Sequence, residues 1–284
     1  ALNGLHWMAT NQNEDGSWYN LYQDNKPLEL NKQTNYASYI AVAVWHFYLL
    51  NNDIHFLKNF WEPVKKGVLF SLSLQHSNGA IAWNIDKSEK IDEDYLLTGC
   101  SSIAKSLECA IAICQVLDHK SFELEWRESH SKLIVALENP AEIFDLKKDR
   151  SRFSMDWYYP ILGGINSKKR IISLIEMIKN SFWIKDLGIK CVADEPWVTV
   201  AETSECSIAF KKIGEDKIAS ELLLNAIAIV DSQDIPYMGW QFHENIYWPE
   251  ETPSWTAAAC ILAADANNKL TPGADLFTKL QFKS

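Results

Sequence analysis

Nearly continuous apolar segments alternate along this chain with amphipathic ones. Residues 35–50 are apolar almost throughout, whereas residues 53–75 carry lysines on one side of the expected helix. The same order returns at residues 98–117 and 122–137. A helix that is apolar all round is typically buried, and a helix with one polar face typically lies at the surface. The pattern therefore predicts pairs of one buried and one surface helix.

The second half repeats this order, with expected helices at residues 155–162, 168–182, 200–213, 215–230 and 255–264. Long polar or aromatic segments connect the pairs at residues 19–34, 83–97, 191–199 and 231–253. Together the segments predict an all-α protein of about ten to twelve helices, arranged as a single α/α toroid of five or six hairpins. Because no linker rich in proline, glycine or serine divides the chain, we expect one domain spanning residues 1–284.

A short turn pattern recurs where surface helices end. Its first copy consists of Gly4, Trp7, Gln12, Gly16 and Trp18. Its second copy consists of Gly67, Phe70, Gln75, Gly79 and Trp83, and a looser third copy of Gln233, Gly239 and Trp240. Glutamine can bond the free carbonyls of a helix end, glycine supplies a left-handed turn, and tryptophan covers the turn with apolar surface. A repeated unit of this kind indicates an array of helical hairpins.

The spacing of these turns resembles the QW motif of the squalene-cyclase and protein-prenyltransferase superfamily, whose helices form an α/α toroid. The segment from Gln12 to Trp18 also resembles turns of the six-hairpin glycosidases, which share that plan. Residues 155–160, 162–164, 197–203 and 254–258 are similar to bacterial proteins labelled prenyltransferase from the fold alone. The resemblance implies the toroid and leaves the chemistry open, since function depends on the site.

The residues that carry cyclase and prenyltransferase chemistry are not found. The segment from Asp92 to Tyr95 departs from the cyclase Asp-x-Asp-Asp motif at its last position, and no Asp-Asp-x-x-Asp diphosphate motif occurs. The aspartate, cysteine and histidine of the prenyltransferase zinc site cannot be placed either. We therefore expect neither a metal nor another cofactor.

Composition and charge restrict the partners. A net charge of −10 and a pI near 5.2 argue against nucleic acid and anionic membranes, which a basic surface would bind. The longest apolar run, residues 36–50, is shorter than the ~20 residues that span a bilayer, so we expect a buried helix there. The six cysteines contain no Cys-x-x-Cys pair, which favours free thiols and a cytoplasmic location. The chain opens at Ala1 inside an apparent helix, so we expect that residues precede it.

Carboxylates and aromatic side chains gather in the segments that precede the buried helices. In a toroid these segments meet at one end of the barrel, which makes that mouth the expected site. The candidate catalytic residues are Asp156 and Glu202, with Asp194 and Glu251 as alternates. The candidate substrate-binding residues are Trp157, Tyr158, Trp197, Trp240, Trp248, Trp255, Trp18, Asp15 and His243.

We predict a carbohydrate-active enzyme of the glycoside hydrolase type, acting on a small-molecule or oligosaccharide substrate. Asp156 lies among aromatic residues, where desolvation favours a neutral acid that could protonate the leaving oxygen. Glu202 would act from the opposite side, with inversion if the two carboxyl groups stand ~6.5–9.5 Å apart. The alternative for Asp156, Glu202 and Asp194 is that each caps a helix start.

Two other functions stay open from the sequence. In an isoprenoid cyclase or prenyltransferase-like enzyme the same acid would protonate an alkene, and the aromatic side chains would stabilise cations. The third possibility is a non-catalytic toroid that binds a glycan or a protein. An enclosed aromatic chamber would favour the cyclase, whereas carboxylates that are all held in ion pairs would favour the non-catalytic protein.

Overall fold

The computed structural model describes residues 1–92 and 94–283. Glu93, which lies within the cyclase-like stretch, falls outside the described residues. Internal contacts divide the chain into two compact units. The first comprises Ala1–Lys148, Gly163–Ile165 and Leu280–Ser284, and the second comprises Asp149–Leu162 and Asn166–Lys279. The expectation of a single domain over residues 1–284 stays a prediction.

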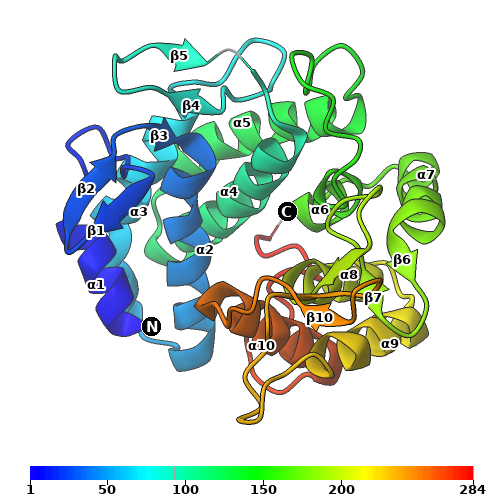
Figure 1. The fold of residues 1–284 in the computed structure, drawn as a ribbon. Coiled ribbons are helices and arrows are strands. Elements are labelled where there is room, and N and C mark those ends of the chain that lie inside the picture. Colours follow the sequence, from blue (N-terminus) through cyan, green and yellow to red (C-terminus); the bar gives the residue numbers. More distant parts are fainter. Residues whose placement is uncertain (93, 284) are drawn as a thin grey trace. The chain divides into compact units, whose positions relative to one another are not determined.

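The first unit is built from helices that alternate between buried and surface positions, as the apolar pattern predicts (Figure 1). Its helices are α1 (Leu2–Thr10), α2 (Thr34–Asn51), α3 (Ile54–Leu72), α4 (Leu97–Leu117) and α5 (Lys120–Glu138). Helix α2 packs against α3 and α4, and α4 also packs against α5. Most residues of α4 are buried, whereas α5 buries one side through Trp126, Leu133 and Leu137.

The connecting segments of the first unit contain short antiparallel strands that the sequence does not signal. Strand β1 (Leu21–Gln23) pairs with β2 (Lys26–Glu29). Strand β4 (Asn84–Ile85) lies between β3 (Lys32–Gln33) and β5 (Ile91–Asp92). Strands of two to four residues are too short to show a polar and apolar alternation, so they read as loops.

The first two copies of the turn pattern have the same geometry. The side-chain amide of Gln12 donates to the carbonyls of Gly16 (2.9 Å) and Pro63 (3.0 Å). The amide of Gln75 donates in the same way to Gly79 and to Ser129, both at 3.0 Å. Each glutamine therefore bonds its own turn and the next surface helix, rather than the end of its own helix as expected.

The glycines of these two turns are required by both conformation and space. Gly16 has φ +91° and Gly79 has φ +92°, a region that glycine enters at little cost. A Cβ on either glycine would stand 2.2 Å from a carbonyl oxygen of the next surface helix, that of Lys66 in α3 or Lys132 in α5. In each repeat the turn therefore packs directly against the next surface helix, α3 or α5.

The third sequence copy of the turn pattern does not form the same turn as the first two, so the prediction of a third structural repeat is wrong. Gly239 is the first residue of a strand and is absent from the described glycines with positive φ. Gln233 is exposed in a tight turn, where its backbone N–H donates to the side-chain carboxylate of Asp231. The sequence similarity arises because glutamine, glycine and tryptophan also suit a hairpin.

The second unit contains five α-helices, short hairpins and a π-helical turn among its described residues (Figure 1). The helices are α6 (Met155–Gly163), α7 (Lys168–Met177), which continues into the π-helical turn η1 (Ile178–Phe182), α8 (Val200–Lys212), α9 (Asp216–Ile227) and α10 (Ser254–Asn268). Helix α8 packs against both α9 and α10 and is the most buried of the three.

A three-stranded sheet of the second unit has the strand order β10-β9-β8. Its strands are β8 (Trp197–Thr199), β9 (Gly239–Gln241) and β10 (Ile246–Tyr247). A separate hairpin pairs β6 (Trp183–Ile184) with β7 (Gly188–Ile189). Strand β8 of this sheet leads directly into the first turn of α8, so its pairing determines where that turn begins.

All six cysteines are free, and five of them are buried, which confirms the prediction of free thiols. By length and composition α4 could cross a membrane, but 83% of its most apolar window is buried within the structure. That burial is the behaviour of a core helix, as expected for the apolar runs of this chain.

Candidate active site

The start of α6 and the segment before α8 run side by side in the second unit. The backbone N–H of Ser154 donates to the carbonyl of Cys191 (3.0 Å), and that of Ala193 donates to the carbonyl of Arg152 (2.8 Å). A β-bridge joins Phe153 to Val192 between these two bonds. This pairing fixes where Asp156 enters the first turn of α6, two residues after Ser154.

The first turns of α8 carry two carboxylates, Glu202 and Glu205. Residues three apart on a helix are neighbours on its surface, so the two carboxyl groups share one side of α8. Below them Thr203 is buried, and its hydroxyl donates to the Thr199 carbonyl and accepts the backbone N–H of Ile189. This anchors the start of α8 to strand β7.

Glu205 lies between two helices and accepts a hydrogen bond on each of its carboxylate oxygens. The Tyr158 hydroxyl donates to Oε2 (2.7 Å) and the Tyr159 hydroxyl donates to Oε1 (3.2 Å). Burial, and then the charge of Glu202, raise the pKa of Glu205 to about 7, although the two tyrosine hydrogen bonds oppose the shift. Burial and the same two carboxylates hold the pKa of Tyr158 well above its usual value.

Glu202 is partly buried and interacts with the thiol of Cys191. Burial, and then the Glu202 charge and the hydrogen bond to that carboxylate, raise the pKa of Cys191. The thiol therefore stays protonated and donates to Glu202.

Asp156 is 6% exposed, and its neighbours differ from those the sequence suggests. The Arg150 Nε lies 3.8 Å from Asp156 Oδ2, and the Arg150 guanidinium also lies over the Phe153 ring. A cation close to a carboxyl group is one of the arrangements that favour its charged form. The arrangement suits a carboxylate that acts as base or nucleophile.

Asp194 is occupied by an ion pair with Arg152. Arg152 Nη2 lies 2.9 Å from each Asp194 carboxylate oxygen, and Nε lies 3.2 Å from Oδ1. Hydrogen bonding to Arg152 lowers the pKa of Asp194, and the side chain is 63% exposed. This geometry holds two chain segments together and makes Asp194 a weaker catalytic candidate than Asp156 or Glu202.

Trp197 crosses the three-stranded sheet. Its indole N–H donates to the carbonyl of Trp248 (2.6 Å), and the ring passes over Gly239 on the strand between them. A Cβ at position 239 would stand 2.6 Å from Trp197 Nε1, so the glycine leaves the space for the indole. Trp248 itself is 57% exposed, which leaves an aromatic surface available beside Trp197.

The remaining candidates on the second unit are spread over the hairpins and helix starts. Trp240 packs edge-on against Tyr247, whose ring stacks on Tyr237 with the centroids 4.0 Å apart. Trp255 is 61% exposed in the first turn of α10. Trp157 donates its indole N–H to the Ser151 carbonyl, and His243 and Glu251 are exposed in loops.

Two candidates belong to the first unit and take part in its turns. Asp15 Oδ2 pairs with Lys32 Nζ (3.0 Å) and its other oxygen accepts from Ser17. Trp18 is 3% exposed and donates its indole N–H to the Met8 carbonyl. Their side chains bond within the first unit and support its turns.

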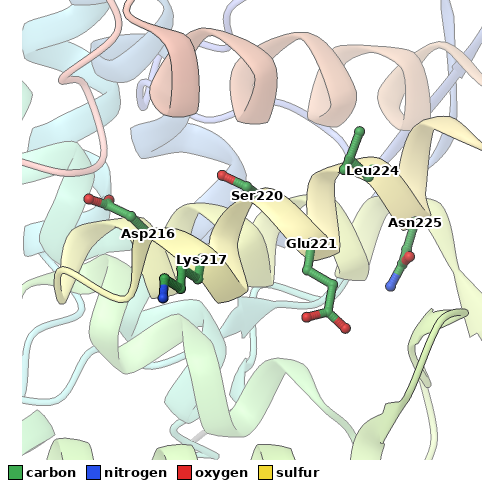
Figure 2. A pocket seen from close by; sticks show the side chains of 6 residues that line it. All are labelled: Asp216, Lys217, Ser220, Glu221, Leu224 and Asn225. Carbon is green, nitrogen blue, oxygen red and sulfur yellow. The ribbon is translucent and has the colours of Figure 1, made fainter.

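A shallow groove along α9 provides a different kind of surface. Figure 2 shows its lining side chains projecting from that one helix: Asp216, Lys217, Ser220, Glu221, Leu224 and Asn225. Asp216 is paired with Lys211 (2.8 Å), and none of the candidate carboxylates contributes to the groove. Among the described residues no group of three or more histidine, cysteine or acidic side chains could hold a metal ion.

Comparison with known proteins adds one sequence relative. No protein-family model matches the chain. The MMP endo-(1,4)-3-O-methyl-α-D-mannosidase of Mycolicibacterium hassiacum is 35% identical over 277 residues, which cover 98% of this chain and 76% of that protein.

Several solved structures share the fold at low sequence identity. The cellobiose 2-epimerase of Bacillus thermoamylovorans gives a TM-score of 0.71 at 12% identity, over 96% of this chain and 81% of that one. A mannosylglycerate hydrolase of Thermus thermophilus gives 0.65 at 10% identity, over 91% and 86%. The endo-β-1,4-glucanase of Acetobacter xylinum gives 0.62 at 11% identity, over 98% and 95%. These matches confirm the predicted all-α toroid of the six-hairpin glycosidase type.

Proposed function

We propose that this chain, which belongs to the glycoside hydrolase family of the Mycolicibacterium hassiacum endo-(1,4)-3-O-methyl-α-D-mannosidase, cleaves internal 1,4-linkages of 3-O-methylated α-mannose chains. The prediction of a glycoside hydrolase is confirmed as a class by this relationship, and the cyclase and non-catalytic alternatives lose their support. The observation that carries the finer proposal is 35% identity maintained across 98% of the chain.

The two proposed catalytic groups are Glu202 and Asp156. Hydrolysis of a glycoside needs one carboxyl group that protonates the leaving oxygen and one carboxylate that activates water or attacks the sugar. Glu202 lies in the first turn of α8, directly after the strand that carries Trp197, and we assign it the role of proton donor. Asp156 faces Arg150, which suits the carboxylate that stays charged. This assignment reverses the roles expected from the sequence, in which Asp156 protonates the leaving oxygen and Glu202 acts from the opposite side.

The proposed substrate platform is formed by Trp197 and Trp248. Strand β8 carries Trp197 and leads within three residues to Glu202, so a sugar held at this indole lies next to the first turn of α8. Flat aromatic rings suit the apolar faces of pyranose rings. A 3-O-methyl group adds apolar surface to the sugar, and exposed Trp248 and Ile246 offer matching apolar surface on the protein.

The test is hydrolysis of a defined 1,4-linked 3-O-methyl-α-D-mannose oligosaccharide, with the unmethylated oligosaccharide as matched substrate. Product lengths are read by mass spectrometry, and the Mycolicibacterium hassiacum enzyme serves as the positive control. We expect cleavage at internal linkages and a higher kcat/KM for the methylated chain. Release of single terminal sugars, or no cleavage where the control enzyme is active, would contradict the proposal.

A further inference from the structure

Two consecutive tyrosines of α6 bind one carboxylate of α8. Tyr158 and Tyr159 each donate a hydroxyl to Glu205, one to each oxygen, at 2.7 and 3.2 Å. Successive side chains on a helix leave it about 100° apart, so two neighbours rarely converge on one group. The Glu205 carboxylate therefore lies in the angle between the two rings, whose centroids are 5.3 Å apart.

This contact lies within one helical turn of both proposed catalytic carboxyl groups. Asp156 precedes Tyr158 by two residues on α6, and Glu202 precedes Glu205 by three residues on α8. A shift of α6 against α8 that breaks either tyrosine bond would thus also move Asp156 relative to Glu202. Tyr158 is fully buried, so its hydroxyl would lose its bond without gaining water in exchange.

We infer that Glu205 is a positioning residue, which through Tyr158 and Tyr159 sets the separation between Asp156 and Glu202. The inference rests on the proposed function. The separation matters because carboxyl groups about 5–5.5 Å apart give retention and those about 6.5–9.5 Å apart give inversion. A displacement of about 1 Å at a catalytic group can reduce the rate about 100-fold.

The contact also depends on the proton of Glu205. As a carboxylate, Glu205 accepts both hydroxyls; as an acid, one of its oxygens carries the proton and accepts more weakly from its tyrosine. The titratable groups around it are Glu202 and Cys206 on its own helix and the two tyrosines on α6. Because the pKa of Glu205 is raised to about 7 by burial and by Glu202, the change falls within the working range of most enzymes.

The experiment compares Glu205→Gln, Glu205→Ala, Tyr158→Phe and Tyr159→Phe in hydrolysis of the methylated oligosaccharide. The matched control is Ser207→Ala on the same helix, which removes a buried hydrogen bond to the Ala219 carbonyl (2.6 Å). We expect Tyr158→Phe and Glu205→Ala to lower kcat about 10- to 100-fold with KM within about twofold. Glu205→Gln keeps one acceptor oxygen and should lose less than Glu205→Ala.

The pH profile provides the second readout. Wild type should show a change in kcat with a midpoint near pH 7 that Glu205→Gln lacks, whereas Ser207→Ala should keep the change. Variants that lose thermal stability as Ser207→Ala does, but keep the wild-type kcat and pH profile, would overturn the positioning role. A wild-type chain without activity on this substrate would overturn the proposed function and this inference with it, so the two failures are distinguishable.

Discussion

The indole N–H of Trp197 donates to the backbone oxygen of Trp248 over 2.6 Å, across the strand that carries Gly239. This bond connects strand β8, which leads into α8, to the exposed aromatic side chain that follows β10. The proposed sugar platform is therefore attached to the element that carries Glu202. A rigid attachment of this kind keeps a bound sugar in register with the reacting groups.

Replacing Gly239 with alanine should disrupt this platform. The added Cβ would stand 2.4 Å from the Val198 oxygen and 2.6 Å from Trp197 Nε1, so the indole must move. We expect KM for the oligosaccharide to rise about tenfold and the free energy of unfolding to fall by about 1–3 kcal/mol. Gly4→Ala is the control, because its Cβ meets nothing within 4 Å and should leave KM unchanged.

Trp248→Ala tests the aromatic surface without the backbone hydrogen bond. It removes only the exposed side chain, while the Trp248 carbonyl that accepts from Trp197 stays. Its KM should rise while thermal stability stays near the wild-type value. An unchanged KM in both Trp248→Ala and Gly239→Ala would show that substrate binds elsewhere.

Glu205 should make the stability of the fold depend on pH. Its pKa is raised from 4.5 to about 7, first by burial and then by the charge of Glu202. The folded state therefore binds its proton more tightly than the unfolded state, and stability falls as pH rises from about 4.5 to about 7, then levels off. The corresponding loss is about 3 kcal/mol.

Glu205→Gln cannot ionise and isolates this contribution. Urea unfolding of both proteins between pH 5 and pH 8 should show wild type losing about 2–3 kcal/mol relative to the variant over that interval. Parallel stability curves would mean that Glu205 titrates at its ordinary pKa in the folded protein.

The turn repeat predicts equal losses at two distant positions. Gln12→Ala and Gln75→Ala each remove two hydrogen bonds to backbone carbonyls, so we expect each to lower the free energy of unfolding by about 1–3 kcal/mol. Gln233→Ala, at the position that the third sequence copy suggests, should change it by less than about 0.5 kcal/mol because the side chain is exposed. Equal effects at all three glutamines would restore the third copy as a true repeat.

Helix positions follow closely from the sequence because the long apolar runs leave little choice of period. The predicted helix at residues 200–213 matches α8 (Val200–Lys212), and that at 98–117 matches α4 (Leu97–Leu117). The partner of Gln75, by contrast, is Ser129 of α5, 54 residues away. Local patterning identifies a turn but not the helix on which it docks.

In the candidate active site too, the sequence identifies the residues but not the partners they contact. Asp156 and Glu202 are recognisable because carboxylates among aromatic residues stand out in sequence. Arg150 and Glu205 change what those two groups can do, yet Arg150 reads as one of several cations in its segment and Glu205 as the second of two acids in α8. Its partners Tyr158 and Tyr159 lie 47 and 46 residues away, so only the packing of α6 against α8 reveals the contact.

The central claim is that Glu202 and Asp156 carry out the hydrolysis, and the direct measurement is kcat of Glu202→Gln and Asp156→Asn on the methylated oligosaccharide. Asp194→Asn is the matched control, since it removes an exposed carboxylate that pairs with Arg152. We predict that the first two variants lose at least about 100-fold in kcat at wild-type thermal stability, and that Asp194→Asn stays within a few-fold of wild type. Near wild-type rates in Glu202→Gln or Asp156→Asn, or an equal loss in Asp194→Asn, would contradict the account.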